Sequence, residues 1–118
     1  MMISILAFAV GLILGYRFPD VDVAPILPLR HRSWLTHGAI IPLAVWLLAE
    51  SQPDWKMFCI GFLAALALHL IDDAGPKSWK GSALVNFYPL PFSLPAIFSW
   101  LYIGAAGAVA AWACVSLI

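Results

Sequence analysis

The longest apolar stretch of the sequence, Ala96–Ile118, reads AIFSWLYIGAAGAVAAWACVSLI and contains no charged side chain. At ~1.5 Å of rise per residue, a helix of this length extends about 34 Å, enough to cross the roughly 30 Å hydrocarbon core of a bilayer. Three further apolar stretches precede it: Met2–Tyr16, Leu35–Ala49 and Met57–Ile71. They lack the alternating pattern of a membrane barrel, and backbone in lipid must satisfy its own hydrogen bonds, so all four are predicted to be helices.

The composition of the whole chain agrees with this prediction. Of its 118 residues, 64% are hydrophobic and 10% are charged, whereas soluble domains are roughly 45–50% apolar and about 25% charged. The net charge of +0 offers no basic field to a nucleic acid. These values exclude a soluble enzyme, a disordered tail and a nucleic-acid binder. We predict an all-α, polytopic membrane protein with a single transmembrane domain over residues 1–118, a bundle of about four transmembrane helices with two polar links on one face.

Three of the four stretches are shorter than the ~20 residues that a span needs. We expect them to continue as helix into the headgroup layer, through Arg17 and through Ser33–Thr36, and Pro42 to kink the second helix without ending it. The alternative is that one short segment is re-entrant. Met2–Tyr16 lacks a basic n-region and an Ala-x-Ala-like exit, so we predict a permanent span there and not a signal peptide.

Small residues within the apolar stretches predict how the helices pack. Gly11 and Gly15 form a GxxxG pair, which lets helix backbones approach closely, and we expect that packing inside the chain and not in a dimer.

Cys59 and Cys114 occur singly in apolar runs, without C-x-x-C spacing, and are interpreted as core residues. The proline-rich link 75–95 cannot form a continuous helix and is expected to be a headgroup-level connector or a lid.

Basic residues are distributed unequally between the two ends of the predicted bundle. Five lie in the links 17–33 and 72–95, and Lys56 is on the opposite side. The five are Arg17, Arg30, Arg32, Lys77 and Lys80. By the positive-inside rule, both long links are predicted to be cytoplasmic and both termini to lie on the other side of the membrane.

Aspartates and histidines are concentrated in the same two links, beginning with Asp20 and Asp22. Pro19 and Pro25 interrupt helix, so we expect these aspartates on irregular or extended chain. Residues two apart on extended chain point the same way, which would let both carboxylates converge on one cation. The alternative is an interfacial turn with solvated carboxylates.

The second cluster surrounds the predicted start of the second helix. Ser33 is a natural N-cap, which places His37 at the fourth helical position and His31 just outside the helix. The alternative for these histidines is a solvated interfacial residue and a polar contact between helices.

The third cluster closes the third helix. His69 and Asp72 are three residues apart and are predicted to share a helix face, as a ligand pair or as a histidine with its supporting carboxylate. Asp72 and Asp73 at a helix C-terminus oppose the macrodipole unless positive charge lies nearby. The alternative is that both are ordinary helix-ending polar residues.

Together, three separate segments deliver His or Asp side chains to one face of a small bundle. A mixed set of imidazoles and carboxylates suits zinc, manganese or iron, and we expect a divalent metal, zinc or manganese. The candidate ligands are Asp20, Asp22, His31, His37, His69 and Asp72. Asp73 or Asp22 is the candidate general base. Arg30 and Arg32 are candidates for binding an anionic substrate group, with topology signal and headgroup contact as their alternative role.

At these motifs the chain resembles the YdjM-like bacterial inner-membrane proteins, a family of predicted membrane-bound metal-dependent hydrolases. The resemblance rests on Asp20-Val21-Asp22, on His31-Arg32 with Thr36-His37, and on His69-Leu70-Ile71-Asp72, in that order. It implies a multi-pass protein of the bacterial inner membrane, with periplasmic termini by the basic-residue count, in which these aspartates and histidines bind a metal. It implies hydrolysis, and the membrane face suggests a phosphorylated or lipid-like substrate.

Two classes of function therefore follow from the sequence. The first is a membrane-embedded metal-dependent hydrolase with its site at the cytoplasmic face. The second is a non-catalytic small subunit of a larger membrane protein complex, in which the polar cluster stabilises an interface. Both have the lipid bilayer as partner, and the second adds other membrane protein subunits. Charged residues are absent from the middles of the predicted helices, which argues against transport.

Overall fold

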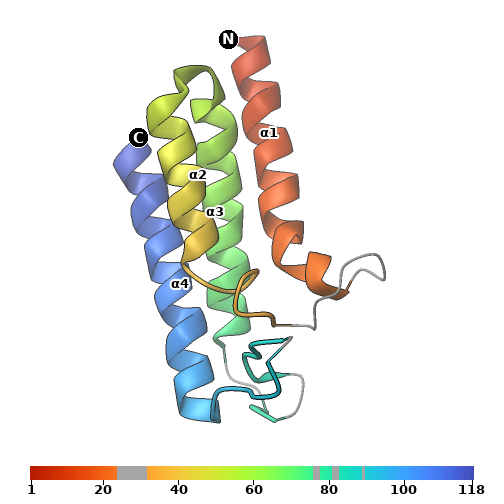
Figure 1. The fold of residues 1–118 in the computed structure, drawn as a ribbon. Helices are drawn as coiled ribbons and strands as arrows, with labels where there is room; N and C mark the ends of the chain where they lie inside the picture. Colours follow the sequence, from red (N-terminus) through yellow and green to blue (C-terminus); the bar gives the residue numbers. More distant parts are fainter. Residues whose placement is uncertain (24–31, 76–77, 81–82, 89) are drawn as a thin grey trace.

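The computed structural model describes residues 1–23, 32–75, 78–80, 83–88 and 90–118. Within this part, the helices that form the bundle are α1 (Met2–Arg17), α2 (Ile40–Ser51), α3 (Lys56–Asp73) and α4 (Ala96–Leu117). They run alternately down and up, so that both long links lie at one end of the bundle and both termini lie toward the other (Figure 1). The predicted all-α bundle and the shared end of its two polar links are confirmed.

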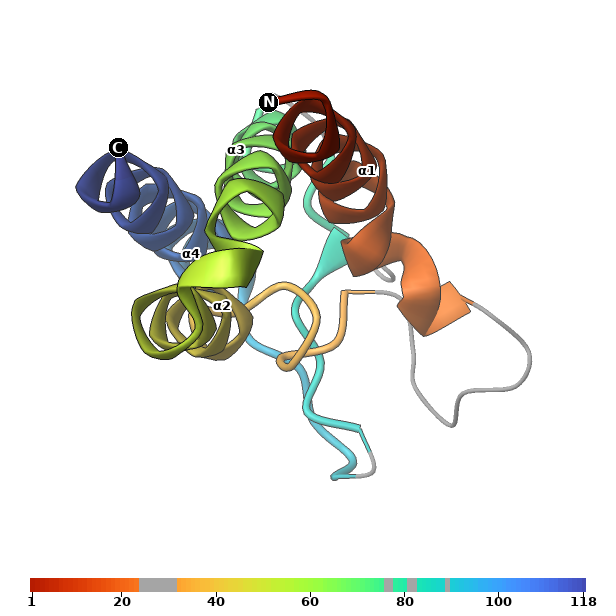
Figure 2. The ribbon, with the colours of Figure 1, turned by 90° about the horizontal axis from the view of Figure 1, so that it is seen from above.

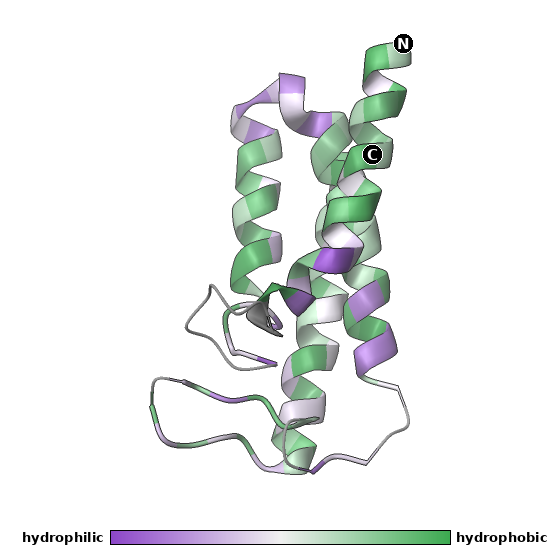
Figure 3. Cartoon of the chain, turned by 90° about the vertical axis from the view of Figure 1, so that its right-hand side faces the viewer, coloured by the Kyte–Doolittle hydropathy of each residue, from purple (hydrophilic) through white to green (hydrophobic). Residues whose placement is uncertain are grey.

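Three of the described helical segments are long and apolar enough to cross a membrane: Met2–Val21, Pro53–Asp73 and Ala96–Leu117. Apolar residues cover the helices along their length, and hydrophilic residues gather at the turn between α2 and α3 and toward the link end (Figure 3). With 12 residues, α2 rises only about 18 Å. Within the described residues, the bundle therefore combines three helices long and apolar enough to span a membrane with one shorter apolar helix.

The core is organised around α3, which packs against α1, α2 and α4. Viewed along the bundle, α3 lies between α1 on one side and α2 and α4 on the other (Figure 2). Leu63, Leu66 and Leu70 of α3 are fully buried, together with Ile103 of α4. Because lipid is as apolar as these side chains, this packing is stabilised by close van der Waals contact more than by the hydrophobic effect.

Glycines allow α1 and α3 to pack backbone against backbone. A Cβ added at Gly11 would overlap the carbonyl oxygen of Phe58, and one at Gly15 would overlap the Phe62 backbone. Gly61 on α3 faces α1 in the same way. The prediction that the GxxxG pair mediates packing inside the chain is confirmed.

We expect Gly15→Ala to lower the free energy of unfolding by about 1–3 kcal/mol, because the added methyl group meets backbone that cannot move aside. The matched control is Gly104→Ala, since nothing lies within 4 Å of a Cβ at Gly104. That change should be neutral or stabilising by up to about 1 kcal/mol, because alanine favours helix over glycine. Thermal unfolding of both variants in detergent measures the difference, and equal stabilities would contradict the packing role of Gly15.

The start of the second helix differs from the prediction. Helix was expected directly after Ser33 as its N-cap, but α2 begins at Ile40 and residues 32–39 form turns. Ser33 begins one isolated turn, accepting a hydrogen bond from the His37 N–H at its carbonyl (3.0 Å). The Tyr102 hydroxyl of α4 donates to the Trp34 carbonyl oxygen (2.6 Å) and so engages a backbone acceptor that a continuing helix would use.

Pro42 consequently has a different role from the one expected. It lies in the first turn of α2, where a missing N–H costs nothing, so it is compatible with the start of the helix and does not need to kink it.

The described residues 83–88 of the second link pack against the first link and α4. Asn86 pairs with the first link, donating to the Arg32 carbonyl (3.2 Å) and accepting from the Trp34 N–H (2.9 Å). Buried Val85 donates to the hydroxyl of Ser99 in α4 (2.9 Å). These bonds tie the two links to each other and to α4, and they hold the segment around Arg32 in place.

Candidate metal centre

Side chains from three separate segments meet at the link end of the bundle. Asp20 comes from the 3-10 helix η1 (Phe18–Val23), His37 from the turn before α2, and His69 from near the C-terminal end of α3. One potential ligand atom from each lies within 4.8 Å of the other two. Both histidines are buried and Asp20 is exposed, so the group is reachable from solvent at Asp20. The predicted convergence of distant histidines and an aspartate is present in the structure.

The end of α1 orients the imidazole of His69. The His69 Nδ1 lies 2.6 Å from the backbone carbonyl oxygen of Tyr16, which can only accept, so Nδ1 carries the hydrogen. When the ring is neutral, its Nε2 lone pair is directed toward two carboxylates, Asp73 Oδ2 at 3.2 Å and Asp20 Oδ1 at 3.6 Å. A lone pair and a carboxylate at these distances repel each other unless a proton or a cation lies between them.

His37 approaches the same point from the opposite side. Its side chain is fully buried, and its Nδ1 lies 3.0 Å from the Thr36 hydroxyl oxygen. Its Nε2 lies 3.2 Å from Asp73 Oδ2, the same oxygen that His69 contacts. The two imidazole rings meet edge-on, with centroids 6.1 Å apart. Both Nε2 atoms therefore face a single small region beside Asp73.

Asp73, and not Asp72, is the helix neighbour of His69. The sequence predicted the pair three residues apart, but the side chain that contacts His69 is four residues on, and Asp72 is exposed. Both spacings lie on one face of a helix, so sequence spacing alone could not separate them. The orientation of α3 in the bundle turns Asp73 toward the histidines.

Arg32 is buried and lies behind Asp73. Its Nη2 is 3.4 Å from Asp73 Oδ1, and its Nη1 donates to the Ala83 carbonyl oxygen (2.9 Å). The guanidinium also lies over the Trp79 ring, 5.0 Å from its centroid. The backbone of Arg32 is left-handed (φ 58°), an uncommon conformation outside glycine. The structure thus places this predicted substrate-binding residue inside the fold as the cation that neutralises Asp73.

Several predicted site residues lie outside the described part of the structure. Arg30 and His31 fall in the segment 24–31, and the side chain of Asp22 is also not described. The expected extended chain at Asp20 is a 3-10 helix, in which residues two apart do not share a side. The two-residue spacing therefore no longer predicts a shared ligand direction.

Sequence reasoning missed two features of the centre. The Tyr16 carbonyl that orients His69 carries no side-chain signal. The contact between Asp73 and both histidines was partly visible, because Asp73 lies one helical turn after His69. Asp73 was predicted from the sequence as a candidate general base or a helix-ending residue, and its contact with both histidines was not predicted.

The side chains fit a divalent metal in kind, and one separation between them also fits in spacing. Two imidazoles and a carboxylate form the mixed nitrogen and oxygen set that zinc and manganese accept. Ligand atoms that bind one zinc at ~2.0–2.2 Å with tetrahedral angles lie about 3.3–3.6 Å apart. The separation of His69 Nε2 from Asp20 Oδ1, 3.6 Å, matches that value.

A depression of about 550 Å³ opens beside the centre. It is lined by Tyr16, Arg17, Asp20 and Val21, at the end of α1 and the start of η1. Asp20 belongs both to this depression and to the metal-binding group. A molecule in the depression would therefore lie beside Asp20, the exposed member of the candidate metal centre.

Comparison with known proteins finds no matching family model, no matching curated protein and no matching solved structure. The site geometry and the sequence motifs therefore carry the functional argument.

We expect Thr36→Val to weaken zinc or manganese binding about tenfold, because partners of the second imidazole nitrogen orient metal-binding histidines. Thr36→Ser keeps the hydroxyl and serves as the matched control, with affinity close to that of the parent protein. Calorimetric titration of the detergent-solubilised proteins measures both. Unchanged affinity in Thr36→Val would show that the hydroxyl does not orient His37.

Proposed function

We propose that this protein is a membrane-embedded metal-dependent hydrolase, in which Asp20, His37 and His69 bind a divalent metal, zinc or manganese. The observation that carries the proposal is the convergence of these three residues from distant segments, with potential ligand atoms within 4.8 Å of one another. Ionisable side chains at membrane depth are costly and are typically functional. The motif order that resembles the YdjM-like proteins supports the same conclusion.

The residues of the centre have separable roles in this proposal. When bound, a divalent metal would polarise a phosphoryl or carbonyl oxygen and activate water. The Tyr16 carbonyl holds His69 in the tautomer that can bind the metal. Asp73 Oδ2, 3.2 Å from both Nε2 atoms, would be the oxygen placed to accept a proton from metal-activated water, and Arg32 at Oδ1 keeps that carboxylate in place.

The proposal places the centre at the cytoplasmic face of a bacterial inner membrane, with periplasmic termini. Its support is the positive-inside rule together with the shared end of the two long links in the bundle. The alternation of the helices puts both links at one end of the bundle whether or not α2 is a full span.

The proposal is tested by metal-dependent hydrolysis. Purified protein is assayed with chromogenic phosphate and carboxylate esters, after chelation and after addition of zinc or manganese. We expect turnover only with metal, its loss in His37→Ala, and its retention in Asp72→Asn, whose parent side chain is exposed. Metal binding without turnover on any of these esters would contradict the hydrolase.

A second candidate is a non-catalytic subunit of a membrane protein complex. It is favoured by the way Arg32, Asp73 and the Ala83 carbonyl join the two links, because such a network can simply stabilise one end of the bundle. In that case His37→Ala would reduce the size of the native complex extracted in mild detergent. A hydrolase would keep its native size and lose only turnover.

A further inference from the structure

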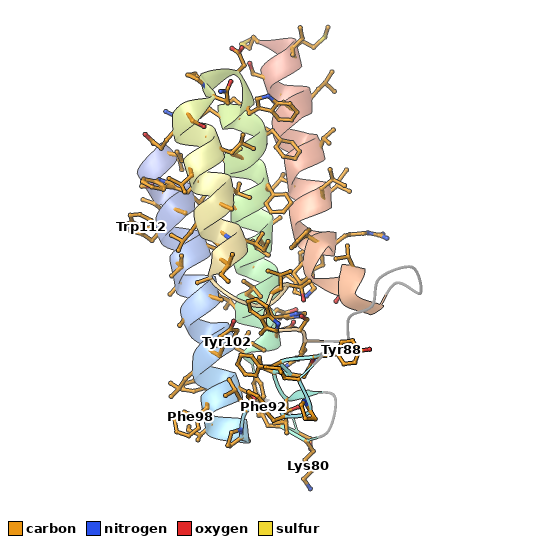
Figure 4. All side chains as sticks on the ribbon, in the orientation of Figure 1. Lys80, Tyr88, Phe92, Phe98, Tyr102 and Trp112 are labelled. Atoms are coloured by element: carbon orange, nitrogen blue, oxygen red, sulfur yellow. The ribbon has the colours of Figure 1, made fainter. Side chains whose placement is uncertain are left out.

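Of the described cationic side chains, Arg17 is the one in position to serve a ligand at the metal centre. The others are Arg32, Lys56 and Lys80. Arg32 is 3% exposed and its guanidinium faces Asp73. Lys56 begins α3 at the opposite end of the bundle, and Lys80 projects from the far tip of the second link (Figure 4). Arg17 is exposed and lines the depression that Asp20 shares with the centre.

We propose that Arg17 forms an anion-binding subsite for a phosphate group, at the mouth of the metal centre. This inference rests on the proposed function, and it names the chemistry of the substrate group that the site receives. Guanidinium binds phosphate through two parallel hydrogen bonds. Asp20 Oδ1 lies 3.6 Å from His69 Nε2, and Asp20 also lines the depression with Arg17, so a phosphate held by Arg17 would lie on the Asp20 side of the metal centre.

The surroundings of Arg17 suit a phosphate carried on a membrane amphiphile as well as free phosphate. One turn earlier on α1, Ile13 and Leu14 are 62% and 49% exposed and face away from the packed helices. Tyr16 lines the depression and sets its ring edge-on against His69, with centroids 5.2 Å apart. An acyl chain can therefore lie along α1 while its phosphate reaches Arg17.

The experiment measures phosphate binding directly, without turnover. Inorganic phosphate is titrated into protein in non-ionic detergent and followed by 31P NMR, with chelator present and with bound Mn²⁺. We expect Arg17→Ala to weaken phosphate binding about 10- to 100-fold, as for loss of a charged hydrogen bond, and Arg17→Lys to weaken it less. Lys80→Ala is the matched control and should bind phosphate like the parent protein. In the manganese-loaded protein, the 31P relaxation rate of bound phosphate should be increased by the paramagnetic Mn²⁺, because the phosphate lies beside the metal.

A second arm distinguishes the source of the phosphate. The same proteins are placed in phosphatidylcholine nanodiscs with and without phosphatidic acid. Competition by phosphatidic acid that depends on Arg17, or binding of phosphatidic acid without binding of inorganic phosphate, supports the subsite with a lipid as its ligand. Binding of inorganic phosphate alone supports it with a soluble ligand.

Failure of this inference and failure of the proposed function give different results. Equal binding of both probes by Arg17→Ala and the parent protein, or equal loss in Lys80→Ala, would overturn the subsite. Absence of metal binding in the parent protein would overturn the metal-dependent hydrolase, whereas Arg17-dependent phosphate binding under chelation would still support the subsite. Unchanged metal affinity in Arg17→Ala is expected in either case, because Arg17 is outside the metal-binding group.

Discussion

Replacing His69 with alanine is expected to weaken zinc or manganese binding at least about 100-fold while the helices remain folded. The change removes an imidazole that contacts two carboxylates of the centre, Asp20 and Asp73. Loss of a supporting partner alone costs about 10- to 100-fold in metal affinity, so loss of a ligand should cost more. Calorimetric titration measures the affinity, and circular dichroism checks the helices.

The same prediction has a thermodynamic readout. At a metal concentration about 100-fold above the dissociation constant, binding should stabilise the parent protein by about 2.7 kcal/mol. This stabilisation should vanish in His69→Ala and, independently, in His37→Ala, whose side chain comes from a different segment. Asp72→Asn should keep it, because Asp72 is exposed. Equal metal-induced stabilisation in all four proteins would remove the basis for the metal centre.

Asp73→Ala is expected to lower the free energy of unfolding of the metal-free protein by about 2–4 kcal/mol. The change leaves the buried Arg32 guanidinium without its carboxylate, and breaking a buried ion pair from one side is strongly destabilising. Asp72→Ala is the matched control on the neighbouring exposed position and should change stability by less than about 0.5 kcal/mol. Unfolding in mixed detergent micelles measures both variants.

A double-variant cycle separates the ion pair from other effects of the Asp73 change. Because Arg32 and Asp73 are in contact, the pair Arg32→Met and Asp73→Ala should be less destabilising together than the sum of the two, by about 1–3 kcal/mol. Additive effects would indicate that Arg32 is held by the Ala83 carbonyl and Trp79 alone.

The ends of the helices show where sequence reasoning succeeds and where it stops. The last helix was predicted over Ala96–Ile118 and is found over Ala96–Leu117, because a long uncharged stretch can only be helix in lipid. The second helix was predicted to begin directly after Ser33 and begins at Ile40. The backbone of Trp34, at the predicted start, is instead hydrogen-bonded to Asn86 and Tyr102, which are both distant in sequence.

Some residues of the candidate centre could likewise be predicted from the sequence and others could not. Asp20, His37 and His69 could be proposed from their motifs, because each lies next to a predicted helix end on the same side of the membrane. Asp73 was predicted as a general base of this site, but its contact with both histidines and the burial of Arg32 beside it were not predicted, since each depends on a contact between segments. A spacing of three or four residues on a helix leaves the partner undecided until neighbouring helices set the rotation.

The amino-acid sequence by itself determined the membrane class, the apolar helices and the end of the bundle that carries the polar residues. These properties follow from the hydropathy of each segment, which depends only on the residues within that segment. Only the tertiary structure decided which carboxylate meets the histidines, that Arg32 neutralises Asp73, and that Arg17 lines the depression beside Asp20. Those outcomes depend on the angle and rotation at which glycine-packed helices and paired links come together, and no local segment encodes that geometry.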